Sequence, residues 1–246
     1  MCGHLRSSGK LIPLSDNTSN RRFPFITLGL IAVNFYVFFG WQIRIGMEES
    51  VMLAGFVPRN LTRHAPDGAL HLFTSMFMHG GLMHLLGNMW FLWVFGNTVE
   101  SDTGAVRFLV FYLLTGAIAT LAHTASEPLS RMPLVGASGA ISGVLGAYLV
   151  KHPGAGIRTL IPLGIFSTII EVPAFVFLLI WIGIQFLSAS ATRGHHGGGV
   201  AYLAHIGGFV AGAVLIFFFQ SKERKMQAAG GPRRRIISSS DARRRD

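Results

Sequence analysis

The sequence predicts an all-α integral membrane protein built around a bundle of six transmembrane helices, and two observations carry this prediction. Half of the 246 residues are hydrophobic and only 13% are charged, a balance far from that of soluble domains. Six apolar stretches follow one another along the chain, judged against the ~20 residues that a helix needs to cross a bilayer. We therefore expect membrane helices and no β-sheet.

The apolar stretches divide the chain into three parts. Residues 1–22 form a polar N-terminal tail, residues 23–221 a six-helix membrane domain, and residues 222–246 a basic C-terminal tail. We expect both tails to be disordered because they have too few apolar residues to form a core. The expected spans are residues 25–43, 82–99, 105–125, 138–151, 172–190 and 198–220.

The basic residues indicate how this bundle sits in its membrane. An even number of spans places both tails on one side, and the positive-inside rule makes that side cytoplasmic. The outer side then keeps only five of the 21 Lys and Arg residues, namely Arg44, Arg59, Arg63, Arg131 and Arg193. The net charge of +10 is thus a topology signal and predicts no nucleic-acid partner. A bacterial inner membrane suits these features, with an organellar membrane as the alternative.

Two connecting segments are apolar but too short to span. Residues 71–79 lie in the long outer loop, and we expect them to form an interfacial or partly buried element. Residues 159–170 are expected to lie along the inner interface.

The fourth expected span is unusually short. Ser138 to Lys151 is 14 residues, about 21 Å of helix against a hydrocarbon core of about 30 Å. Its outer end therefore begins below the membrane surface, and the preceding segment with Pro133 and Gly136 descends to it. Irregular backbone at that depth needs protein or a water-filled cavity around it. We expect Ser138 to lie in a wet pocket that opens outward.

Three other polar side chains are expected at a similar depth. His84 and Asn88 share one face near the outer end of the second span, and His205 lies about 10 Å into the sixth. Gly208 and Gly212 share the face of His205 and would let the sixth span pack against the glycines of the fourth. Taken singly, these features also fit a glycine zipper and polar clamps between helices.

The chemistry available to this set is limited by the absence of acidic residues from the outer half of any expected span. A serine and histidine dyad remains, with Ser138 as nucleophile and His205 as general base. The Ser138 backbone N–H, His84 and Asn88 would donate to a developing oxyanion. A metal site built on His79, His84 and His205 is a weaker alternative because the chain lacks HExxH and suitable carboxylates. No metal or cofactor is therefore expected.

Four motifs resemble the rhomboid family of intramembrane serine proteases. They are FMHGGLMHLLGNM at residues 77–89, GNTVE at 96–100 followed by Gly104, GASGAISG at 136–143, and AHIGGF at 204–209. The match runs from about Leu53 to Phe218. Four separate motifs in the expected order and on the expected spans make the resemblance highly specific.

This resemblance implies a six-helix core, with Ser138 as nucleophile, His205 as base, and His84 and Asn88 as oxyanion donors. It also implies substrates that are single transmembrane helices, cut near the outer face. Glu100 is given a packing or capping role. Many bacterial members have an aromatic residue four positions after the serine that stacks on the histidine; here that position is Ser142, which leaves the orientation of His205 open.

Two other functions stay open at this point. A catalytically silent protein of the same fold would bind and route membrane helices without needing both Ser138 and His205. A metal or small-solute transporter would work independently of Ser138.

Overall fold

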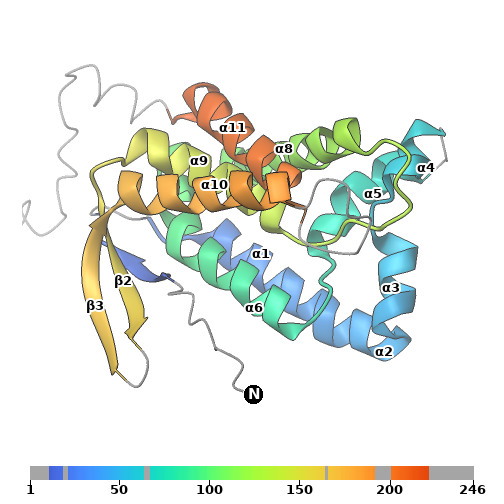
Figure 1. The fold of residues 1–246 in the computed structure, drawn as a ribbon, viewed down its shortest axis with the longest axis horizontal. Coiled ribbons are helices and arrows are strands. Elements are labelled where there is room, and N and C mark those ends of the chain that lie inside the picture. The colour runs from blue at the N-terminus through green and yellow to red at the C-terminus, as the bar shows by residue number, and fades with distance from the viewer. Residues whose placement is uncertain (1–10, 19–21, 64–66, 164–165, 192–200, 222–246) are drawn as a thin grey trace, which may run out of the picture.

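The computed structural model describes residues 11–18, 22–63, 67–163, 166–191 and 201–221. Long helices lie side by side in the middle of the molecule, with the short helices α3 to α5 at one end and the β2–β3 hairpin at the other (Figure 1). The elements are β1 (Ile12–Asp16), α1 (Phe25–Phe35), η1 (Tyr36–Gln42), α2 (Ile43–Ile45), α3 (Met47–Ala54), α4 (Pro58–Thr62), α5 (Gly68–Thr74), η2 (Ser75–Phe77), α6 (Leu82–Phe91), η3 (Leu92–Gly96), α7 (Asn97–Thr103), α8 (Ala105–Ser126), α9 (Ser138–Lys151), β2 (Gly156–Leu163), β3 (Phe166–Pro173), α10 (Ala174–Ala191) and α11 (Tyr202–Phe219).

Four helical stretches among the described residues are long and apolar enough to cross a membrane. They are Phe25–Ile45, Ala105–Ser126, Ala174–Ala191 and Tyr202–Phe219. The mostly helical membrane architecture is therefore confirmed. The other two expected spans are helical, as α6 to α7 and as α9, but do not belong to this set. The count of six spans and the side on which the tails lie remain predictions.

Helix α9 lies against both α8 and α11, and glycines set how closely α11 approaches it. A Cβ on Gly212 would overlap the carbonyl oxygen of Gly143, and a Cβ on Gly146 would overlap that of Phe209. Small residues let two backbones come this close. The predicted packing of the sixth span against the glycines of the fourth is therefore confirmed.

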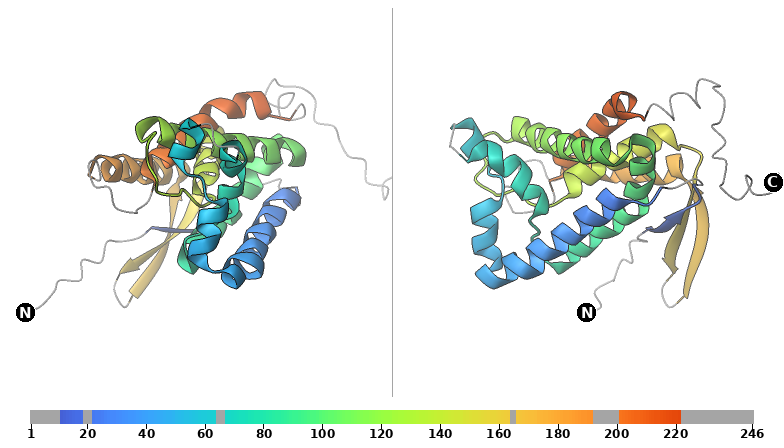
Figure 2. Two further views of the ribbon diagram at one scale, coloured as in Figure 1. Left: turned by 90° about the vertical axis from the view of Figure 1, so that its right-hand side faces the viewer. Right: turned by 180° about the vertical axis from the view of Figure 1, so that it is seen from behind.

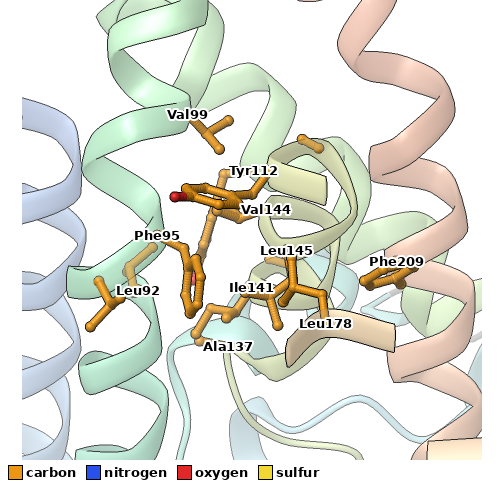
Figure 3. Packing of buried hydrophobic residues seen from close by; sticks show 14 of the residues in the cluster. Leu92, Phe95, Val99, Tyr112, Ala137, Ile141, Val144, Leu145, Leu178 and Phe209 are labelled. Carbon is orange, nitrogen blue, oxygen red and sulfur yellow. The ribbon is translucent and has the colours of Figure 1, made fainter. Parts of the chain in front are cut away.

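Aromatic side chains fill the space between α9 and the helices beside it. The Phe95 and Tyr148 rings meet edge to face with centroids 5.0 Å apart, and both side chains are fully buried. Ile141, Val144 and Leu145 of α9 extend this core (Figure 3). Burying aromatic rings contributes much of the apolar stabilisation of a core, and these contacts hold α9 in the middle of the bundle.

Glu100 of α7 caps the start of α1. Its carboxylate accepts hydrogen bonds from the backbone N–H groups of Ile26 and Thr27 at 3.0 and 2.8 Å and from the Thr27 hydroxyl at 2.7 Å. A carboxylate stabilises a helix start because the first-turn N–H groups have no partner within the helix. The capping role expected for Glu100 is confirmed.

The structure contains a three-stranded antiparallel sheet, in the order β1-β2-β3, so the expectation of no β-sheet was wrong. Of residues 159–170, expected to lie along the inner interface, 159–163 belong to β2 and 166–170 to β3. These two paired strands are rich in the β-branched residues that favour strands. Residues 12–16, expected to be disordered, pair with residues 157–160. That pairing joins segments far apart in sequence, which a local pattern does not reveal. The basic C-terminal tail lies outside the described residues.

Hydrogen bonds that involve side chains connect β1 to the helices. The Asp16 carboxylate accepts hydrogen bonds from the Tyr148 hydroxyl at 2.7 Å and the Thr98 hydroxyl at 2.8 Å. The Trp90 indole N–H donates to the Pro13 carbonyl at 2.6 Å. Two further views show β1 beside the hairpin at the end of the bundle opposite α3 to α5 (Figure 2). The sheet thus lies at the end of α9 that is remote from Ser138.

Candidate active site

Ser138 is the first residue of α9, and an irregular segment leads to it. The backbone of Leu134 exchanges hydrogen bonds of 3.0 and 2.7 Å with Phe56, and the Gly136 N–H donates to the Ser75 carbonyl at 2.9 Å. Ser75 belongs to the segment 71–79, which runs from α5 through η2 to His79 and is partly buried, as predicted. Backbone groups of Phe56 and Ser75 thereby pair with the polar backbone groups of the irregular segment before Ser138.

Ser138 and His205 lie within hydrogen-bond distance of each other. The Ser138 Oγ is 2.9 Å from the Nε2 of His205, although the residues are 67 positions apart in sequence. His205 is buried, with 9% of its surface exposed. The close approach of α9 and α11 at their glycines brings the two side chains together. A hydroxyl beside a neutral imidazole nitrogen is an arrangement that can activate a nucleophile.

The other ring nitrogen of His205 contacts α10, which the sequence did not predict. His205 Nδ1 lies 2.8 Å from Gln185 Oε1. The Trp181 ring, one helical turn before Gln185, has its centroid 6.0 Å from that of His205 with the planes 32° apart. The sequence held a usable signal, since Gln185 is the only strongly polar residue within residues 174–187, and such residues in apolar spans tend to be functional.

His84 and Asn88 flank Gly136, two residues before Ser138. A Cβ on Gly136 would lie 2.8 Å from His84 Nε2 and 3.4 Å from Asn88 Nδ2, and its φ of +120° is one that L side chains rarely adopt. Asn88 is buried, and its Nδ2 has no hydrogen-bond partner among the described residues. The Gly80 N–H donates to His84 Nδ1 at 3.4 Å, so a neutral His84 carries its proton on Nε2. Both residues thus present donors near the start of α9.

His79 lies beside His84, in the connection between η2 and α6. Gln42 clamps its backbone, accepting from the His79 N–H at 2.9 Å and donating to its carbonyl at 3.1 Å. The imidazole is fully buried, with its ring centroid 5.2 Å from that of His84. Burial, reinforced by the neighbouring His84, lowers the pKa of His79 to about 3, so the ring is neutral at ordinary pH. The ring packs edge to face against His84.

A cavity of about 30 Å³ lies next to Ser138. Ser75, Thr120 and Ser138 give it a polar lining, and Gly116, Gly139 and Ala140 leave the space open. A water molecule needs about 10–15 Å³ measured in this way. The cavity is large enough to hold water beside the serine. No group of three or more His, Cys, Asp or Glu side chains that could hold a metal ion occurs in the described part of the chain.

Comparison with known proteins identifies the family. The model of the rhomboid domain matches residues 66–222, a range that contains His84, Asn88, Ser138 and His205. This chain belongs to the rhomboid family. The resemblance stated from the four motifs is thereby confirmed.

Similar proteins come from bacteria and from mitochondria. The chain is 32% identical over 192 residues to rhomboid protease GluP of Bacillus subtilis, covering 78% of this chain and 35% of that protein. It is 31% identical over 183 residues to the mitochondrial presenilin-associated rhomboid-like protein A of Danio rerio, covering 72% of this chain and 46% of that protein. A shorter match, 40% identical over 78 residues and covering 32% of this chain and 39% of that protein, is to the putative rhomboid protease YdcA of Bacillus subtilis. The chain therefore spans less than half the length of these relatives.

Proposed function

We propose that this rhomboid-family chain is an intramembrane serine endopeptidase that uses Ser138 as nucleophile and His205 as general base. The observation that carries the proposal is the 2.9 Å contact between Ser138 Oγ and His205 Nε2. Two further features support it: the serine begins a helix, where backbone N–H groups lack partners within the helix, and a water-sized cavity lies beside it.

Peptide cleavage would proceed in two halves. The Ser138 hydroxyl gives its proton to His205 Nε2 while Oγ attacks the carbonyl carbon of the scissile bond. The resulting oxyanion is stabilised by the Ser138 backbone N–H, His84 and Asn88. His205 then protonates the leaving amine, which leaves an ester on Ser138. Water, activated by His205, hydrolyses that ester and regenerates the serine.

The substrates we propose are single-pass transmembrane proteins, cut near the outer face of the membrane. A helix in lipid has its peptide bonds hydrogen bonded and shielded from water, so the substrate must unwind where it meets Ser138. We further propose six spans with both tails in the cytoplasm, and a bacterial inner membrane as the location. The basic residues of the tails support this orientation.

The decisive experiment compares the unchanged protein with Ser138→Ala in reconstituted membranes. We expect the unchanged protein to cleave a reporter transmembrane helix and to be labelled at Ser138 by a fluorophosphonate. Ser138→Ala should lose both activities while keeping its thermal unfolding transition. Ser126→Ala, which removes an exposed hydroxyl at the end of α8, is the matched control and should behave like the unchanged protein.

The outcomes separate the competing functions. Cleavage retained by Ser138→Ala would reject the assigned nucleophile. A folded protein that binds helical segments without cleaving them or reacting with the fluorophosphonate would be a silent member of the fold. Solute flux or bound metal that is independent of Ser138 would indicate a transporter.

A further inference from the structure

His205 has to present one particular nitrogen to Ser138. A neutral imidazole carries a proton on only one of its two nitrogens, and the other accepts. A general base toward Ser138 must keep Nε2 unprotonated, because Nε2 is the atom 2.9 Å from the hydroxyl. The proton must then sit on Nδ1, and the group that Nδ1 contacts decides how firmly it is held there.

Gln185 supplies the matching group. Its Oε1 lies 2.8 Å from His205 Nδ1, and an amide oxygen can only accept a hydrogen bond. The amide orientation has its own support: the Gln185 Nε2 donates to the Trp181 carbonyl at 3.5 Å. With the amide reversed, its oxygen would face that carbonyl oxygen and its NH₂ would face Nδ1. The observed orientation is the one in which both ends of the amide have complementary partners.

Gln185 is also placed where an unpaired amide would be costly. It is buried, with 8% of its surface exposed, and every other residue of 174–187 is apolar or glycine. An amide buried in apolar surroundings without a hydrogen-bond partner is strongly destabilising. The contact with His205 offsets that cost. A neutral amide also avoids the larger desolvation cost of a buried carboxylate.

We propose that Gln185 is a positioning residue that fixes His205 in the Nδ1–H tautomer and thereby presents Nε2 to Ser138. The proposal rests on the proposed function, because it matters only if His205 acts as a base. Gln185 acts through His205 and does not contact Ser138 in any of the hydrogen bonds of the described residues.

Trp181, on the same helix as Gln185, also contacts the His205 ring. Gln185 and Trp181 are four positions apart and therefore lie on one face of α10. The Trp181 ring also stacks on Phe209, with centroids 6.2 Å apart. Ser142, one turn after the serine, donates to the Ser138 carbonyl at 2.6 Å and offers no ring to His205. Helix α10 supports the histidine with both a ring and a hydrogen-bond acceptor.

The first test separates turnover from substrate binding. Gln185→Leu keeps the bulk of the side chain but removes the acceptor, and we expect kcat for the reporter helix to fall about 10- to 100-fold with little change in KM, since general-base catalysis contributes about 10²–10⁴-fold. Gln185→Glu keeps an oxygen at the same reach and should recover most of the rate. Gln185→Met, whose thioether accepts only weakly, is a second variant should the leucine protein fail to fold. Ile184→Ala, which trims an exposed neighbour on α10, is the matched control and should keep the unchanged kcat.

The second test does not depend on activity. Nitrogen NMR of histidine-labelled protein distinguishes protonated from unprotonated ring nitrogens, and the His205 signals are assigned by their loss in His205→Ala. We expect one tautomer, with the proton on Nδ1, in the unchanged protein and a mixture in Gln185→Leu. An unchanged tautomer or an unchanged kcat in Gln185→Leu would overturn the positioning role. If the unchanged protein does not cleave at all, the proposed function fails, and the NMR result still decides whether Gln185 fixes the ring.

Discussion

At the scale of single residues, Asn88 carries a buried donor that no other described residue uses. Its Nδ2 lies close to Gly136 and hence to the start of α9. A buried donor without a partner is costly, and an oxyanion formed at Ser138 would satisfy it in the transition state. In the proposed reaction the amide would therefore gain a partner that it lacks in the resting protein.

Replacing Asn88 by leucine should slow cleavage far more than it weakens substrate binding. We expect kcat to fall about 10²-fold or more with KM nearly unchanged, because removing one oxyanion donor typically costs 10²–10³-fold. Steady-state cleavage of a reporter helix in vesicles measures both constants. Asn34→Ala removes a buried amide whose Nδ2 donates to the Leu30 carbonyl within α1, and it serves as the control. Equal losses of kcat in the two variants would argue against an oxyanion role for Asn88.

At the scale of elements, the contact of α9 with α11 sets the distance between serine and histidine. Gly212 of α11 faces the backbone of Gly143, so a side chain there must push the helices apart. Because Ser138 and His205 are carried by these two helices, a shift of either one changes the geometry of the pair. The close contact of α9 with α11 at their glycines and the contact between Ser138 and His205 therefore depend on the same packing of the two helices.

Gly212→Ala should weaken both stability and activity. We expect the free energy of unfolding in detergent to fall by about 1–3 kcal/mol, as for other overpacked contacts, and cleavage to slow in the protein that remains folded. Gly183→Ala is a matched control because a Cβ at Gly183 has nothing within 4 Å. It should be neutral or slightly stabilising, since alanine favours helix over glycine. Similar destabilisation in both variants would mean that loss of helix glycine, rather than the α9–α11 contact, causes the effect.

At the scale of the whole molecule, β1 connects helices at the end remote from the serine. Asp16 receives hydrogen bonds from Thr98 in α7 and Tyr148 in α9, while its own strand pairs with β2. About 15 Å of α9 separates Tyr148 from Ser138 at the usual helical rise. This strand therefore contributes to the stability of the bundle without touching the candidate active site.

Asp16→Ala should destabilise the protein while leaving the catalytic constants of the folded fraction unchanged. We expect a loss of about 2–3 kcal/mol in the free energy of unfolding, as for buried hydrogen bonds to a charged group. A double-mutant cycle with Tyr148→Phe measures the part due to their contact. Asp67→Ala, which removes an exposed carboxylate at the start of α5, should change stability little. A coupling energy near zero would show that the strand is held by other contacts.

Much of the helical architecture could be predicted because apolar stretches long enough for membrane helices are a local property of the sequence. The expected spans at residues 25–43, 105–125 and 172–190 coincide closely with helices in the structure. The β1–β2 pairing could not be predicted, because it joins residues 12–16 to residues 157–160. The roles of Ser138, His205, His84 and Asn88 remain predictions, although the structure brings Ser138 to His205 and brings His84 and Asn88 to Gly136.

The sequence alone determined the family, the helical class and the residue types available for chemistry. Each of these depends on apolar runs and short motifs, which are local properties of the chain. Only the tertiary structure decided which atoms of those residues meet. Ser142 left the orientation of His205 open, and it was the packing of α10 against α11 that placed Gln185 on Nδ1. Hydrogen bonds between helices depend on their rotation and depth, to within a few tenths of an ångström, and a one-dimensional pattern does not fix either.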